Sequence, residues 1–277
     1  MVSNVVEELA YRDREFVFKD RLHAGALLAD KLRPLLAGRD VQLLAVPAGG
    51  VAVGYAVAQK LNMPLDIVIV RKIQIPWNTE AGFGAIAWDG RVLLNELLVA
   101  QLGLSTQVVE QRISQTREMV RQRMQKFRGN RPFPDLNGKT VILVDDGLAS
   151  GFTMLAAAES IRTKQPEKIV IAVPTASAGA IELLAPSVDE LVCLNVRCGP
   201  IFAVADAYEK WYDLKSGDVD TAVLDPSHQA VNRIVHPIAR YRVLIWYRFF
   251  RFYLQVLILD EHLWNCSHDR KKGLVGT

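Results

Sequence analysis

The sequence contains little cysteine and little net charge. Its three cysteines, Cys193, Cys198 and Cys266, show no CxxC spacing. This argues against a disulfide framework and a zinc site, and it favours a reducing cytoplasm. The formal net charge of +3 over 277 residues gives no electrostatic basis for binding nucleic acid. The histidines have no metal-binding spacing within one predicted element either.

Long uninterrupted apolar runs are also missing. Charged side chains are scattered through the first twenty residues, so we expect no signal peptide. Residues 241–259 approach the length of a membrane span, but Arg242, Arg248 and Arg251 interrupt them, and a central arginine costs roughly 2.5–3.5 kcal/mol on insertion scales. A helix packed on the domain or on a partner subunit, an interfacial amphipathic helix and a tail without a settled role all stay open. We favour packing and expect no firm membrane association.

Short apolar segments alternate with helical patterns along most of the chain. Strands are predicted at residues 41–46, 66–70, 140–144, 168–173 and 190–194. Helices are predicted at 21–37, 51–61, 106–128, 153–163 and 177–184. This order is typical of an α/β fold with βαβ crossovers, in which helices flank a mostly parallel sheet. We expect one domain over residues 1–225 and a C-terminal tail over 226–277.

Residues 71–95 break this pattern. Glycine, proline and tryptophan punctuate them, and their apolar positions are irregular. They predict a long, mobile excursion that can form a hairpin, with Asp89-Gly90 as its turn.

The strongest chemical signal follows the apolar strand 140–144. Two adjacent carboxylates, Asp145 and Asp146, come first, and a loop of small residues leads into a helix: Gly147, Leu148, Ala149, Ser150, Gly151, Phe152 and Thr153. Such a strand delivers the carboxylates to the edge of the sheet where ligands bind. The glycines and the helix N-terminus suit a phosphate, whereas the carboxylates suit sugar hydroxyls or a divalent cation.

Two other phosphate-binding patterns are excluded at this loop. It has no Gly-Lys-Ser/Thr sequence and is therefore no Walker A loop, and its aspartates precede the glycines, unlike a dinucleotide fingerprint. An ordinary strand-to-helix turn with acidic residues near a helix N-terminus is the remaining alternative, and we disfavour it.

The stretch 141–153 closely resembles the 5-phosphoribosyl-1-pyrophosphate (PRPP) signature of type I phosphoribosyltransferases, including its Ser150-Gly151-Phe152-Thr153 ending. The resemblance covers residues 16–225, with Asp20-Arg21 and Ala24-Gly25 near its start. It implies that fold, with a flexible loop and a small hood. It also implies that Asp145 and Asp146 bind the ribose hydroxyls and, directly or indirectly, Mg²⁺, while residues 147–153 bind the 5-phosphate.

The resemblance assigns further residues to the leaving group. Ala48, Gly49 and Gly50 occupy the position of the pyrophosphate loop, although many relatives carry an arginine where this chain has Ala48. Arg71 and Lys72 stand at the start of the family's flexible loop and join the two aspartates as expected catalytic residues. Glu80 and Gly84 would lie in the moving part of that loop.

The acceptor is a nitrogenous base that the sequence leaves unnamed. Phe202 and Tyr208 lie in a segment that resembles the hood over the base, where an aromatic ring could stack. Ala149 stands where hypoxanthine-guanine transferases carry an aspartate, which argues against their mechanism; adenine transferases also carry alanine there.

Two functions from different classes remain. The first is a cytoplasmic transferase that moves the phosphoribosyl group from PRPP to a base and releases pyrophosphate, with a homodimer as a candidate assembly. The second is a PRPP-sensing regulator with little or no catalysis, for which Ala48 and the unusual tail would be suited. The basic side chains of helix 106–128 could serve a partner or RNA, but we favour a solvated face.

Overall fold

The computed structural model describes residues 4–199 and 202–212. The chain divides into two units, residues 1–235 and 236–277, and the second lies outside the described residues. The apolar segment 241–259 also lies outside the described residues, as does the predicted domain boundary at 225/226. Both stay predictions. Among the described residues, no helix has both the length and the apolar character needed to cross a membrane.

A six-stranded sheet forms the centre of the first unit, with the strand order β1-β9-β8-β7-β2-β3. All neighbouring strands in it are parallel. The strands are β1 (Val5–Glu7), β2 (Val41–Ala45), β3 (Leu65–Ile67), β7 (Thr140–Val144), β8 (Lys168–Ser177) and β9 (Glu190–Arg197). The predicted parallel α/β sheet is therefore confirmed, although β1 was not predicted and β8 and β9 extend further than expected.

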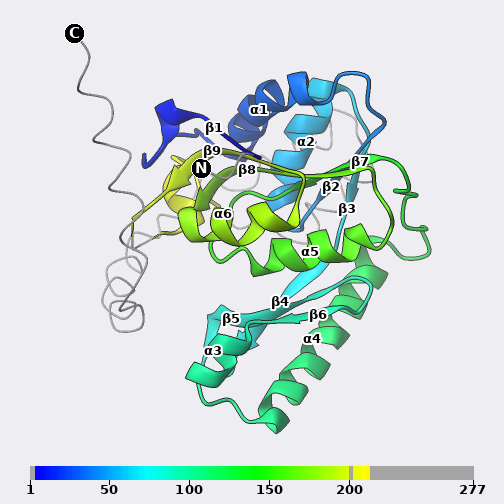
Figure 1. Cartoon of the computed structure of the whole chain (residues 1–277), viewed down its shortest axis with the longest axis vertical. Helices are drawn as coiled ribbons and strands as arrows, with labels where there is room; N and C mark the ends of the chain where they lie inside the picture. The colour runs from blue at the N-terminus through cyan, green and yellow to red at the C-terminus, as the bar shows by residue number, and fades with distance from the viewer. Residues whose placement is uncertain (1–3, 200–201, 213–277) are drawn as a thin grey trace. The chain divides into compact units, whose positions relative to one another are not determined.

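Helices cover both faces of this sheet (Figure 1). On one face lie α1 (Arg21–Leu32) and α2 (Gly49–Leu61), and on the other lie α5 (Phe152–Arg162) and α6 (Ala178–Leu184). The buried strand β7 shows why both faces are covered. Ile142 and Val144 belong to one apolar cluster, and Val141 and Leu143 belong to another, as the two-residue period of a strand requires. Short 3₁₀ turns occur at η1 (Leu9–Tyr11), η2 (Arg33–Leu35), η3 (Ala185–Ser187) and η4 (Val204–Ala207).

The strand order changes direction between β2 and β7. From β2 the chain continues outward to β3, whereas from β7 it continues the other way to β8 and β9. Ligands of open α/β sheets bind at such a switch point, beyond the carboxyl ends of the strands. The fold thus brings the loops after β2 and β7 together.

A second, antiparallel sheet occupies residues 70–94 and has the order β4-β5-β6. Its strands are β4 (Val70–Ile75), β5 (Asn78–Ala87) and β6 (Val92–Leu94), and α3 (Glu96–Gln101) and α4 (Thr106–Phe127) follow. The predicted hairpin is confirmed, because β5 and β6 pair antiparallel and Gly90 of the predicted turn has φ +87° and donates to the Ala87 carbonyl at 2.9 Å. The irregular backbone expected here is wrong, because residues 70–94 form regular strands. Gly84 lies in β5, and glycine is needed there because a Cβ would lie 2.4 Å from the carbonyl oxygen of Leu93 on the neighbouring strand.

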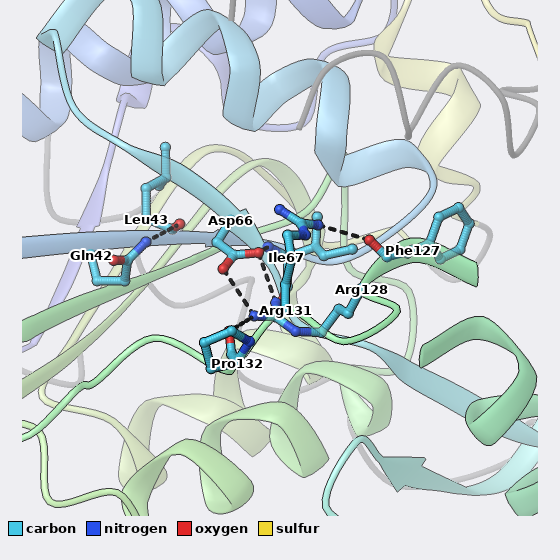
Figure 2. A network of polar contacts seen from close by, with 8 residues as sticks. All are labelled: Gln42, Leu43, Asp66, Ile67, Phe127, Arg128, Arg131 and Pro132. Atoms are coloured by element: carbon cyan, nitrogen blue, oxygen red, sulfur yellow. Dashed lines mark hydrogen bonds and ion pairs between the residues drawn. The ribbon is translucent and has the colours of Figure 1, made fainter. Parts of the chain in front are cut away.

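Arg128 fastens the end of α4 to the edge strand β3 (Figure 2). Its side chain is buried, and its guanidinium contacts both carboxylate oxygens of Asp66 at 2.7 and 3.2 Å. It also donates to the carbonyls of Pro132 at 2.6 Å and Ile67 at 3.3 Å. The predicted solvated face of this helix therefore does not include Arg128, which is an interior link between the second sheet's helix and the main sheet.

Candidate functional site

The two carboxylates and the Pro-Ala-Gly-Gly loop meet at the switch point. The Pro47–Ala48 peptide bond is cis, and α2 begins at Gly49, two residues earlier than predicted. A Cβ on Gly49 would lie 2.0 Å from Oδ2 of Asp146, and a Cβ on Gly50 would lie 2.8 Å from Cα of Asp145. Glycine at both positions is therefore what lets the loop after β2 approach the loop after β7.

Asp145 and Asp146 differ in their surroundings. Oδ2 of Asp146 accepts a hydrogen bond from Nε of Arg21 at 2.8 Å. Oδ1 of Asp145 accepts one from the Asp146 backbone N–H at 2.8 Å. Burial and the neighbouring charge of Asp146 raise the pKa of the Asp145 carboxyl well above its usual range. The protein itself compensates the negative charge of Asp145 only in part. Hydroxyl donors or a cation bound at the two carboxylates would stabilise this charge further.

The loop after the aspartates is held by the extension of β8. Leu148 donates to the Thr175 carbonyl at 3.0 Å, and Ser177 donates its N–H to the Leu148 carbonyl at 3.0 Å. The Ser177 hydroxyl also donates to the Ala149 carbonyl at 2.6 Å. Leu148 is buried, whereas Ala149 and Ser150 are exposed. The loop is therefore fixed through its backbone while its tip remains open to solvent.

Helix α5 begins at the end of this loop. Its N-cap is Gly151, which has φ +78° and provides no side-chain cap, and no acidic residue occupies the first turn. The N–H groups of such a turn and the positive end of the helix suit an anion. Ser150 and Thr153 flank the turn. The structure thus brings the residues predicted for the 5-phosphate to one helix N-terminus.

Arg71 and Lys72 lie within β4 and not at the start of a loop, and Glu80 and Gly84 lie in β5. Lys72 passes over Gly82, where a Cβ would lie 2.4 Å from the Lys72 Cγ. Arg71 shares a strand face with Ile73, which packs with α4. Burial and the charge of Arg71 lower the pKa of Arg123 on that helix. Among the ion pairs described for residues 4–199 and 202–212, none includes Arg71.

The predicted hood residues have different environments. Phe202 is half-buried. Tyr208 is 1% exposed, its ring contacts those of Phe18 and Trp211 at centroid distances of 5.6 and 5.4 Å, and its hydroxyl donates to the Asp146 carbonyl at 2.6 Å. In this conformation Tyr208 supports Asp146 and presents no open ring face to a base.

Sequence reasoning gave no role to Arg21 or Trp211. Arg21 is the first residue of α1, where the helix dipole disfavours a cation. That unfavourable placement was the available signal for a role outside the helix. Trp211 had no comparable signal, because a single aromatic residue beyond the last strand is common.

Comparisons with known proteins agree with this geometry. Residues 20–197 match the phosphoribosyl transferase domain family. A Mycobacterium tuberculosis protein that is provisionally named a phosphoribosyl transferase is 35% identical over 213 residues, which cover 77% of this chain and 47% of that protein. The crystal structure of TT1426 from Thermus thermophilus has 36% identity and a TM-score of 0.62, and the match covers 75% of this chain and 98% of that one.

A ribose-phosphate pyrophosphokinase of Pyrococcus furiosus matches a shorter stretch, with 37% identity over 73 residues and 26% of each chain. The chain spans about half the length of the curated mycobacterial relative that it matches, 47%. The matched family covers every strand from β2 to β9, both loops of the switch point and the helix that begins at Phe152. The chain therefore belongs to the phosphoribosyl transferase domain family.

Proposed function

We propose that this protein transfers the 5-phosphoribosyl group of PRPP to a nitrogenous base and releases pyrophosphate. One observation carries the proposal: the paired carboxylates after β7 touch the glycine loop after β2, beside a helix N-terminus without an acidic cap. A ligand that combines vicinal hydroxyls, a phosphate and a pyrophosphate fits this combination. In the reaction, the bond from ribose C1 to the pyrophosphate oxygen breaks, a bond from C1 to a base nitrogen forms, and the proton of that nitrogen is released to the pyrophosphate or to solvent.

Each part of the site would act on one part of PRPP. Asp145 and Asp146 accept the ribose 2- and 3-hydroxyls, and each charge-assisted hydrogen bond contributes about 1.5–3 kcal/mol. The first turn of α5, with Ser150 and Thr153, binds the 5-phosphate. Gly49, which is half-buried, leaves its backbone beside the site of the leaving group, whereas Gly50 is buried and its N–H donates to the Val46 carbonyl at 3.1 Å. Orientation of the reactants and stabilisation of developing charge are the protein's main contributions.

The cations of the second sheet would serve the pyrophosphate. The loop after β2 itself carries no cationic side chain, because its second residue is Ala48, which packs against an apolar cluster. Arg71 on β4 lies close enough to Arg123 for its positive charge to lower the pKa of that residue. We assign to Arg71 and Lys72 the role of stabilising the negative charge on the leaving pyrophosphate.

Mg²⁺ fits the site as a companion of the substrate. Among the described residues, no group of three or more His, Cys, Asp or Glu side chains could enclose a metal ion. Mg²⁺ is commonly bound through one or two carboxylates together with substrate phosphates, and Asp145 and Asp146 are the residues that would hold it, directly or through the ribose hydroxyls. When bound, the ion neutralises charge on the departing pyrophosphate.

The loop provides no carboxylate for deprotonating a purine. Ala149 is exposed, and its carbonyl is already bound by Ser177. A mechanism that needs an aspartate at this position is therefore not proposed. We place the reaction in the cytoplasm, where the thiols of Cys193 and Cys198 would stay reduced.

Ala48 also favours a second candidate function, that of a regulator that binds PRPP and does not turn it over. Mixing the protein with Mg²⁺, PRPP and a panel of purine and pyrimidine bases, and following pyrophosphate release, distinguishes the two. Release with one base supports the transferase. PRPP binding by calorimetry without release for any base supports the regulator.

The binding claim has its own test. We expect the double variant Asp145→Asn/Asp146→Asn to lose PRPP affinity. Asp30→Asn, which removes an exposed carboxylate paired with Lys60 on the helices α1 and α2, should keep it. Unchanged PRPP binding in the double variant, or no binding by the wild type, would refute the proposed site.

A further inference from the structure

Arg21 reaches from the first turn of α1 to the carboxyl end of β7. It is 3% exposed, so its charge must be compensated by neighbours within the protein. The Nε–Asp146 hydrogen bond described above uses one edge of the guanidinium. Because Asp146 is itself largely covered, with 13% side-chain exposure, the two side chains fix each other's position.

The other edge of Arg21 contacts the C-terminal end of the described chain. Nη1 donates to the Tyr212 carbonyl at 2.8 Å. The guanidinium carbon lies 3.8 Å from the centroid of the Trp211 ring, which is within the range of a cation–π contact. A single planar group thus joins a carboxylate of the proposed ribose site to an aromatic side chain.

Residues 208–212, which we call the aromatic segment, are attached to Asp146 at two points. The Tyr208 hydroxyl bonds the Asp146 carbonyl directly, and the Trp211-Tyr212 end is attached through Arg21. Trp211 is nevertheless 40% exposed, so part of its ring surface remains open. The segment is anchored where it contacts Asp146 and accessible where it faces solvent.

Asp146 has little room to move independently of these contacts. A Cβ on Gly49 would lie within 2.3 Å of its Cγ, so the glycine loop closes one side and Arg21 closes another. A ligand that binds the Asp146 carboxylate therefore also restricts the position of the Arg21 guanidinium.

We propose that Arg21 is a positioning residue that couples the carboxylate of Asp146 to Trp211 and the rest of the aromatic segment. This inference rests on the proposed PRPP site. Sugar hydroxyls that hold Asp146 in place also hold the guanidinium against Trp211. Because coupling is reciprocal, a change at Trp211 alters PRPP affinity. The open part of the Trp211 ring is then a surface on which a planar acceptor base gains affinity once PRPP is bound.

A double-mutant cycle tests the coupling. Lysine at position 21 keeps the positive charge near Asp146 but lacks the planar fork that reaches Tyr212 and lies on Trp211. We expect Trp211→Leu to weaken PRPP binding about 2- to 30-fold in the wild type, the range of a cation–π contact. In the Arg21→Lys background the same change should weaken it less than about 1.5-fold. The dissociation constants are measured by calorimetry on the full chain with Mg²⁺ and PRPP.

Arg128→Lys is the matched control, since Arg128 is also a buried arginine with a carboxylate, backbone carbonyls and an aromatic ring as partners. It should lower the free energy of unfolding and leave the Trp211→Leu factor at its wild-type value. If Trp211→Leu weakens binding equally in the wild-type and Arg21→Lys backgrounds, Arg21 does not couple the two sites and the inference is wrong. Absence of PRPP binding in the wild type would instead refute the proposed function.

Discussion

Gly49→Ala is the substitution that most directly probes the contact between the two loops. The added Cβ would lie 2.0 Å from Oδ2 and 2.3 Å from Cγ of Asp146. This carboxylate is short and is bonded to Arg21, so it can yield only by leaving the position at which it would bind a ribose hydroxyl. Loss of one charge-assisted hydrogen bond, about 1.5–3 kcal/mol, corresponds to about 10- to 150-fold weaker PRPP binding.

Calorimetric titration with PRPP and Mg²⁺ measures this loss, and circular dichroism checks that the variant is folded. Gly49 is the first residue of α2, and alanine is favoured over glycine in a helix, so unfolding of the helix is not expected to explain weaker binding. Gly179→Ala is the matched control, since a Cβ at this helical glycine would meet nothing within 4 Å. Equal PRPP affinity in the two variants would show that Asp146 does not hold the ribose.

Three further predictions concern stability, pH and metal. Arg128→Met should lower the free energy of unfolding in urea by about 3–5 kcal/mol, because it leaves Asp66 without its buried partner, and an unchanged midpoint would contradict this. Burial and the charge of Asp146 raise the pKa of the Asp145 carboxyl above its ordinary value of 3.8, so the wild type should lose stability as the pH rises from 3.8 through the raised pKa. The variant Asp145→Asn should have the same free energy of unfolding as the wild type near pH 3.8 and a higher one at neutral pH. Parallel curves of stability against pH for the two proteins would refute the raised pKa of Asp145. Excess EDTA should abolish pyrophosphate release, and release that continues in EDTA would exclude Mg²⁺ dependence.

The main sheet could be predicted because its strands are buried on both faces. Residues 141–144 form an uninterrupted apolar run, and the observed β7 has the bounds predicted for the strand, 140–144. The range of helix α4 was equally clear, and its N-cap Ser105 accepts a hydrogen bond from the Val108 N–H through its hydroxyl. Apolar periodicity and capping are local signals, so one sequence suffices to read them.

The second sheet could not be predicted for a physical reason. Residues 67–70 are apolar and β-branched throughout, so nothing marks the point at which the chain leaves the main sheet. Val68 still bonds the carbonyl of Ala45, and the chain enters β4 two residues later. The glycines of β5 were interpreted as loop residues. The reason for glycine at these positions is the close approach of a neighbouring strand, which is visible only in three dimensions.

The candidate site was predictable in its sequence-local part. Asp145 to Thr153 are contiguous, and each residue type has its own chemical reason. The contacts of Arg21 with Asp146 and of Tyr208 with the Asp146 backbone join residues 125 and 62 positions apart. No local pattern specifies such pairings, which depend on the order of strands in the sheet.

Ser177 connects the open tip of the loop after β7 to the start of α6. Its hydroxyl accepts from the Ala180 N–H at 3.0 Å and donates to the Ala149 carbonyl at 2.6 Å. Local unfolding of α6 would therefore release the loop as well, and the two segments should open as one cooperative unit in hydrogen exchange. A ligand held by the loop would then slow the exchange of amides in α6, a helix that it does not touch.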